Sequence, residues 1–270
     1  LLIPERLHLV LGAKLEHNSY TGLEVQPSAR ILWSPDSQRS LWASISRAVR
    51  TPSRGETSVS IQSWTPVPIS PPIITMLPTF LHANDQFKSE TVLAHEIGYR
   101  QQLNDRFFYD LALFYNRYNN LRTLDPTLQP TRIDISIGNS MKADSYGLEL
   151  SAEWQPTTWL RLQAAYTSLW LDMRLKPAST DRTATAAEEL APRHQLSLRS
   201  SFNLGPTLSL DTWLRYVDGI TALNSDGVSF SRIDPYLTAD IRVAWHPTRN
   251  IELALVGRNL VEPSHKEFIT

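Results

Sequence analysis

The residues best suited to bind a ligand lie in two segments that interrupt an otherwise regular alternation of side chains. The longer segment spans 51–90 and the next spans 120–130. A guanidinium group is planar and always charged, so arginines here suit anionic, oxygen-rich ligands. The alternative, which the sequence leaves open, is that they only keep exposed loops soluble. The candidate ligand-binding residues are Arg50, Arg54, Trp64, Arg122 and Arg132.

A second group of charged residues occupies the polar positions of the alternating runs. On one face of a strand, such side chains line a water-filled interior or contact a partner that fills it. Neither role is catalytic. This group consists of Glu96, Arg100, Glu149, Glu153, Arg199, Arg215, Asp240, Arg242 and Arg258.

The sequence contains no convincing catalytic arrangement. It has no Gly-x-Ser-x-Gly elbow, no His-Glu-x-x-His pair and no glycine-rich phosphate loop. Its 7 histidines are scattered without ligand spacing. The adjacent Glu188 and Glu189 fall in a polar connection, where we expect them to be solvated or to start a loop helix. We therefore expect neither an enzyme nor a metal or cofactor site.

Composition removes further classes of protein. The 270 residues carry 26 basic and 27 acidic side chains, and this balance argues against a nucleic-acid partner. Without cysteine there is no disulfide framework and no thiolate chemistry. No apolar run approaches the roughly 18–20 residues of a membrane helix. Because the chain opens with Leu1 and no signal sequence, we expect a mature form or a fragment.

Alternation of apolar and polar residues runs through almost the whole chain. Tyr146, Leu148 and Leu150, for example, alternate with Gly147 and Glu149. Side chains alternate across a strand, so each run has one apolar and one polar face. Most runs reach the 9–11 residues that a tilted strand needs to cross a bilayer. The pattern predicts eleven antiparallel strands at residues 6–18, 24–34, 39–50, 91–102, 106–119, 131–155 (with a bend near Gly138 and Asn139), 159–173, 191–204, 207–218, 232–246 and 249–260.

The connections between these strands alternate between short turns and longer polar segments, with 18–23 as a short exception. Short turns and long loops at opposite ends are typical of an outer-membrane barrel. The short turns fall near 34–36, 103–105, 155–158, 205–206 and 246–250, and the long connections are 51–90, 120–130, 174–190 and 219–231. Within the longest one, the Pro-rich segment 64–78 is expected to form a stiffened loop and not a strand.

Four of the 8 tryptophans flank the short turns, namely Trp33, Trp154, Trp159 and Trp245. An indole prefers the membrane–water boundary, because its ring is apolar while its N–H stays hydrated. Four at one level favour an aromatic girdle, and the alternative is that each simply shields a turn. The expected fold is all-β, an antiparallel up-and-down transmembrane β-barrel.

Several segments resemble the barrel of TonB-dependent outer-membrane receptors, in matching order across about residues 24–262. The family usually has Asn-Pro a few residues before Glu90, whereas here Asn84 precedes Asp85. The stretches that carry the resemblance are 26–35, 41–53, 88–91 with 95–100, 114–121, 146–150, 192–195 and 256–260.

This resemblance implies a larger, 22-stranded barrel plugged by an N-terminal domain, of which residues 1–270 supply about eleven strands. It implies uptake of a scarce ligand across the outer membrane of a Gram-negative bacterium, driven through the plug by the TonB–ExbB–ExbD system. A ferric siderophore is the first expectation, and haem or cobalamin the others. The polar-face charges are then expected to face the lumen and the plug. Outer-membrane lipid and a small-molecule iron chelate are the remaining expected partners.

The chain departs from the family pattern at its ends. The plug, the TonB-contacting segment and the closing strand are absent from residues 1–270, so we expect a fragment that does not transport by itself. The haem receptors of the family carry a Phe-Arg-Ala-Pro motif before a loop His, and this chain matches it only loosely, with Val49 to Pro52 and His82 further on. Two other classes stay open, a passive porin or autotransporter-type barrel and a soluble all-β binding module.

Overall fold

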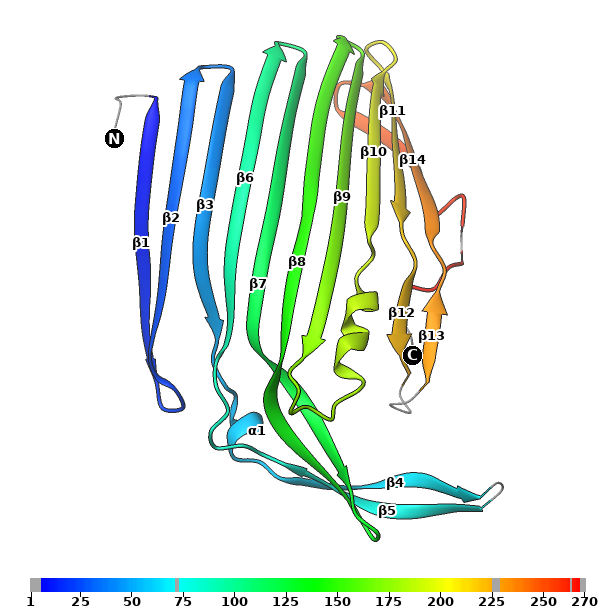
Figure 1. Cartoon of the computed structure of the whole chain (residues 1–270). Helices are drawn as coiled ribbons and strands as arrows, with labels where there is room; N and C mark the ends of the chain where they lie inside the picture. The colour runs from blue at the N-terminus through cyan, green and yellow to red at the C-terminus, as the bar shows by residue number, and fades with distance from the viewer. Residues whose placement is uncertain (1–5, 71–72, 225–228, 263, 268–270) are drawn as a thin grey trace.

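The computed structural model describes residues 6–70, 73–224, 229–262 and 264–267. In the described residues thirteen strands form one sheet, and eleven of them run side by side, each antiparallel to its neighbours, which confirms the predicted order and pairing of these eleven (Figure 1). In spatial order they are β1 (Leu7–Asn18), β2 (Gly22–Asp36), β3 (Arg39–Arg50), β6 (Glu90–Asn104), β7 (Phe107–Leu128), β8 (Ile133–Thr157), β9 (Leu160–Leu175), β10 (His194–Asn203), β11 (Leu208–Val217), β14 (Tyr236–Thr248) and β15 (Ile251–Gly257).

The register keeps the two kinds of side chain on separate faces across the whole sheet. Glu149 of β8 lies opposite Ala112 of β7 and Thr167 of β9, all on what we call the polar face. Its neighbour Leu150 lies opposite Leu111 and Tyr166 on the other, apolar face. A shift by one residue would exchange the faces, so the alternation of the sequence fixes the register.

The apolar face is not covered by any other layer. Large apolar side chains on it stay exposed, including Leu11 (71%), Ile97 (47%) and Leu255 (77%). Only a few apolar side chains are fully buried, and Phe87, Ile137, Met141 and Ala143 among them lie near the loop end of β6 and β8. A sheet this apolar on one side needs an apolar surrounding to be stable.

The short turns lie together at the upper edge in Figure 1, and the long connections lie at the lower edge. The four tryptophans beside the short turns are each about half exposed, from 46% for Trp159 to 50% for Trp245. No helix in the described part of the chain is long and apolar enough to cross a membrane.

The expectation of a loop at 64–78 is wrong, because this segment contributes to a hairpin of β4 (Ile61–Ser70) and β5 (Ile73–His82). Proline lacks the N–H of a ladder bond, which is why it argues against a central strand. The register pairs Pro66 with Met76 and Pro78 with Trp64, and Pro78 lies just before the residues of β5 that pair with β8. Among the described residues β4 pairs only with β5, so it is an edge strand, while β5 also pairs in parallel with β8.

Two other connections are also more ordered than expected. β7 and β8 continue through 120–130 as one long hairpin, since Thr127 and Leu128 still pair with Asp134 and Ile133. The connection 219–231 contains β12 (Ile220–Leu223) paired with β13 (Phe230–Ile233), so the strand expected at 232–246 is interrupted between Ile233 and Tyr236. Pro235 lies at that interruption.

The bend expected near Gly138 and Asn139 is present in the long hairpin. The β7–β8 register shifts between Tyr118 and Thr123, and Gly138 pairs with Thr123. A Cβ atom at Gly138 would lie 2.8 Å from an Asp125 carboxylate oxygen and 2.9 Å from the Thr123 hydroxyl, so glycine allows this close approach. The connection 174–190 carries a 3-10 helix, η1 (Ala184–Leu190), in which the Glu188 carboxylate accepts a hydrogen bond from the Met173 amide.

Candidate functional site

The loop end of the sheet is organised around one buried carboxylate, Glu56. It belongs to α1 (Arg54–Thr57), a single helical turn that follows β3, and is 4% exposed. Its carboxylate accepts hydrogen bonds from the Ser53 amide (2.8 Å) and hydroxyl (3.0 Å), which is the geometry of a capping box. A buried carboxylate costs free energy unless it is paired, so Glu56 requires cationic neighbours.

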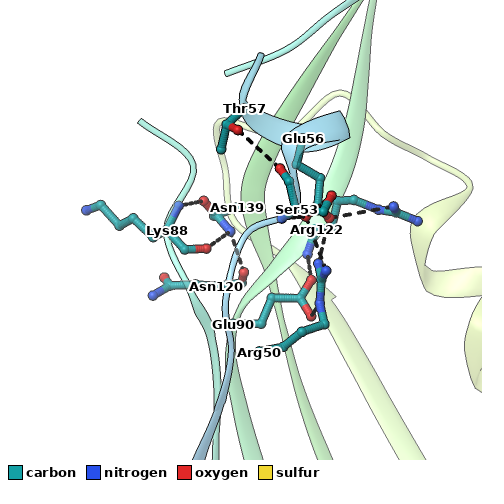
Figure 2. A network of polar contacts seen from close by, with 9 residues as sticks. All are labelled: Arg50, Ser53, Glu56, Thr57, Lys88, Glu90, Asn120, Arg122 and Asn139. Carbon is teal, nitrogen blue, oxygen red and sulfur yellow. Dashed lines mark hydrogen bonds and ion pairs between the residues drawn. The ribbon is translucent and has the colours of Figure 1, made fainter. Parts of the chain in front are cut away.

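Arg50 supplies the main counter-charge. Its two terminal nitrogens donate to the two Glu56 oxygens at 2.7 and 3.2 Å, and its Nε donates to Glu90 at 2.7 Å (Figure 2). Burial alone raises the pKa of Glu56, but the hydrogen bonds from Arg50 and Ser53 outweigh it and lower that pKa to about 2. Arg122 adds a third contact, 3.7 Å from Glu56, while its amide donates to Glu90 at 2.8 Å. The cluster therefore ties β3, α1, β6 and β7 together.

Asn139, at the bend of β8, links the neighbouring backbone segments (Figure 2). Its carbonyl accepts from the Lys88 amide at 2.7 Å, and its amide donates to the Lys88 and Asn120 carbonyls at 3.0 and 2.6 Å. Asn120 has a φ of +57°, a left-handed conformation that asparagine tolerates better than most residues. The Lys176 ammonium donates to the Asn139 carbonyl at 2.7 Å and to the Asn120 side chain at 3.2 Å.

Arg132 lies apart from this cluster, next to the start of β8 where β5 joins it. Its Nε contacts Asp134 at 2.9 Å, and its guanidinium lies 6.0 Å from the centre of the Phe80 ring. His82 contacts the other Asp134 oxygen at 2.9 Å. Trp64 projects from β4 opposite Pro78 and is 59% exposed.

The five expected ligand-binding residues thus fall into different environments. Arg50 and Arg122 meet at Glu56, and Arg132 is paired with Asp134. Arg54 is exposed on α1, and among the described residues its side chain has no ion-pair partner. The structure therefore joins two of the five, keeps three separate, and leaves Arg54 and Trp64 as the most accessible.

The charged residues expected on the polar face do share one face. The ladders connect Glu96 and Arg100 of β6, Glu149 and Glu153 of β8, Arg199, Arg215, and the β14 pair Asp240 and Arg242 on that face. Arg258 directly follows the end of β15. Most of these side chains form cross-strand contacts, such as Arg100 with Asp110, Glu153 with Arg161 at 2.8 Å, and Arg242 with Asp211 at 3.4 Å.

Two cations of the polar face meet at Trp213 of β11. The guanidinium groups of Arg199 and Arg215 lie 3.9 and 4.1 Å from the centres of its rings, and the indole N–H donates to the Ser197 hydroxyl at 2.7 Å. Arg215 also contacts Asp240 at 3.2 Å. Arginine stacks well on an aromatic face, which offsets the repulsion between the two cations.

These arginines border a hollow of about 700 Å³ that extends to the loop-borne residues after β15. Arg215 Nε is buried there and has no hydrogen-bond partner in the described part of the chain. Charged atoms in its lining include Arg199, Asp211, Arg242 and Arg258. Trp213 and Asp211 were not among the expected site residues, although an aromatic residue between two charged positions of a polar face was the signal that would have identified them.

Within residues 6–70, 73–224, 229–262 and 264–267, no three His, Asp or Glu side chains are grouped so that they could hold a metal ion.

Comparison with solved structures shows a shared fold. The siderophore receptor PirA from Acinetobacter baumannii superposes with a TM-score of 0.72 at 17% identity, over 96% of this chain and 40% of that one. A variant of the ferric enterobactin receptor PfeA from Pseudomonas aeruginosa, in complex with enterobactin, gives 0.72 at 18%, over 96% and 38%. The FrpB iron transporter from Neisseria meningitidis gives 0.64 at 15%, over 89% and 36%.

The chain thus spans about two fifths of the length of the first two of these structures, and its sheet corresponds to part of a barrel. No curated protein matches it. Residues 3–260 match the family described as TonB dependent receptor-like, beta-barrel. Since this match covers nearly the whole chain, the chain belongs to the TonB-dependent receptor β-barrel family.

Proposed function

We propose that residues 1–270 form one partial barrel domain of an outer-membrane receptor that takes up a ferric siderophore with energy from TonB. The observation that carries this proposal is the separation of faces across eleven strands. An exposed apolar face suits lipid, and a continuous polar face suits a hydrated interior. The protein would be a transporter of the Gram-negative outer membrane, without enzymatic activity.

The ligand class is supported by the cationic character of the candidate residues. A ferric siderophore presents anionic oxygen atoms, which guanidinium groups bind well. Arg54 and Trp64 are the accessible members of the group at the loop end, so we assign ligand contact to them first. Arg50 and Arg122 act as positioning residues, because their charges already serve Glu56 and Glu90. The neighbouring structures named as siderophore and enterobactin receptors favour this class over haem or cobalamin.

We assign the polar face to the lumen, where it would contact the plug domain and the trapped water. The stack of Arg199, Trp213 and Arg215 is the strongest candidate for plug contact, because Arg199 keeps its charge without an ion pair among the described residues. An acidic side chain of the plug is the natural counterpart. TonB, working with ExbB and ExbD, would then act on the plug and not on this part of the barrel.

The test is uptake of radiolabelled iron by cells that carry the full gene product containing residues 1–270. Iron-starved cells lacking this gene should lose accumulation of at least one ferric siderophore, and complementation should restore it. The same complemented cells without TonB should show no uptake above background. An Arg54→Ala, Trp64→Ala double variant should raise the concentration for half-maximal uptake several-fold, whereas Arg232→Gln on β13 is the matched control.

Each alternative class predicts a different result. Uptake that persists without TonB would identify a passive porin. Recovery of the protein from the soluble fraction, with a cooperative melt in detergent-free buffer, would identify a soluble binding module. If cells lacking the gene lost uptake of haem alone, haem would replace the siderophore as the proposed ligand.

A further inference from the structure

The apolar face ends at the same level on three neighbouring strands. On β8 the apolar run extends from Trp154 to Tyr146, which is about 27 Å at the rise of a strand. A tilt of roughly 40° reduces this to about 20 Å, close to the roughly 25 Å apolar band of outer-membrane barrels. Tyr146 stacks on Trp170 of β9 with ring centres 5.8 Å apart, and Tyr115 of β7 pairs with Tyr146. These aromatic residues form the loop-side border of the band.

Charged residues follow directly beyond this border, on the same face. The next outward-facing residues are Arg117 on β7, Asp144 and Lys142 on β8, and Asp172 and Arg174 on β9. All of these residues except Asp172 line a cleft of about 600 Å³, which Lys176 also borders. The cleft therefore lies where the headgroups of the outer leaflet meet the barrel.

The cleft has more cations than anions. Its lining contains Arg117, Lys142, Arg174 and Lys176, but Asp144 is its only carboxylate. Asp144 is already engaged by Arg174, by Arg117 at 3.5 Å and by the Tyr115 hydroxyl at 2.8 Å.

These cations differ in how far their charge is already paired. Lys142 is exposed and has no ion-pair partner among the described residues, and Arg174 is 56% exposed although it also lies 3.6 Å from Asp172. Burial and the ammonium groups of Lys142 and Lys88 lower the pKa of Lys176, as expected where positive charge is in excess.

We propose that this cleft binds the phosphate group of a phosphorylated lipid headgroup in the outer leaflet. Arg117 and Arg174 are fixed by Asp144 and present their remaining N–H groups, while Lys142 approaches as a mobile point charge. The acyl chains of the same lipid would lie on the apolar band below, along Leu148 and Leu150. The inference rests on the outer-membrane location proposed above, but it does not require the siderophore ligand.

The test measures lipid binding by the full gene product containing residues 1–270, purified in neutral detergent micelles. The probe is lipid A with two phosphates, titrated by native mass spectrometry beside its dephosphorylated derivative and inorganic phosphate. Lys142→Gln and Arg174→Gln should each weaken lipid A binding about five-fold. Asp172→Asn, which removes a carboxylate beside Arg174, should strengthen it. Arg232→Gln, an exposed arginine of β13, is the control.

Several results would overturn the proposal. Equal binding of the dephosphorylated derivative would exclude phosphate recognition, and equally tight inorganic phosphate would exclude the lipid. Unchanged lipid A affinity in both Gln variants would exclude the cleft. Heat-modifiable migration in gels shows whether each variant is folded, and Arg174→Lys should restore most of the affinity. Iron uptake is measured separately, so loss of uptake with retained lipid binding counts against the proposed function alone.

Discussion

The arginine cluster at the loop end and the one on the polar face balance their charge in opposite ways. At the loop end, Arg50 and Arg122 converge on Glu56, a buried carboxylate, and Glu90 completes the set. On the polar face, Arg199 and Arg215 lie on the two sides of Trp213, and only Arg215 has a carboxylate partner among the described residues. The first cluster uses its charge to hold loops together, whereas in the second the charge of Arg199 is not paired with a carboxylate among the described residues.

Removal of the buried carboxylate should have the largest effect. Glu56→Gln leaves Arg50 with Glu90 as its remaining carboxylate partner and leaves the Arg122 guanidinium with none among the described residues, and breaking a buried pair costs about 3–5 kcal/mol. Because Arg50 is 47% exposed, we expect about 2 kcal/mol of local destabilisation. Hydrogen exchange of the amides in 51–60 should accelerate accordingly. Glu189→Gln, on the exposed side of η1, is the control. Equal exchange rates in both variants would show that Glu56 does not stabilise the segment 51–60.

The aromatic stack should show a smaller effect. Trp213→Leu removes two cation–π contacts and leaves Arg199 and Arg215 to repel each other, which we expect to cost about 1 kcal/mol. Urea unfolding of the full barrel in micelles measures it. Trp213→Phe should lower the free energy of unfolding by less than Trp213→Leu, because an aromatic ring remains between the two arginines. A double-mutant cycle of Arg199→Gln and Trp213→Leu measures the coupling free energy between the two side chains. A coupling of zero would contradict the stack.

Acidification should weaken the loop cluster but not the aromatic stack. The pKa of Glu56 is lowered from 4.5 to about 2 in the fold, so its contribution is complete above pH 4.5 and is lost as the pH falls through about 2. Between pH 5 and pH 4 only a fraction is lost, and amide exchange in 51–60, corrected for its intrinsic pH dependence, should rise slightly. The Glu56→Gln variant should lack this rise. A rise that persists in the variant would assign the effect to another group.

Substitution of Arg132 should have the smallest effect on stability. Its contact with Asp134 is exposed on the arginine side, and such pairs contribute less than about 1 kcal/mol. Arg132→Gln is expected to change the free energy of unfolding by less than about 0.5 kcal/mol. A larger decrease in the free energy of unfolding, measured by urea denaturation, would mean that the contact of Arg132 with Phe80 fixes β5 on β8.

The strands and faces of the sheet could be predicted because each follows from the pattern of residues within one short segment. A period of two is visible in each segment, and the face of Glu149 follows from its neighbours alone. The hairpin of β4 and β5 is not predicted, because Pro66 and Pro78 argue against a strand, and neither the position of β4 at the edge nor the end of the β5–β8 pairing is visible in the sequence. The β12–β13 pairing was missed for a related reason, since strands of four residues carry too little pattern to distinguish from a loop.

The site was only partly predictable, because pairing over long sequence distances decides which charge is free. Arg50, Arg54 and Arg122 look alike in the sequence, but Glu56 and Glu90 engage the first and third and not the second. The Trp213 stack combines β10 with β11, and only the register of Arg199 with Trp213 reveals it.

Asn139 has a mechanical consequence for the loops. One side chain joins Lys88, which ends the first long connection, to Asn120, which begins the second. The two connections are therefore joined at Asn139, in addition to the contacts of Arg122 with Glu56 and Glu90, and neither can move outward while the other stays in place unless these bonds break. A ligand that displaces one of the two connections would therefore also displace the other, so the two loops should open together about the bend in β8.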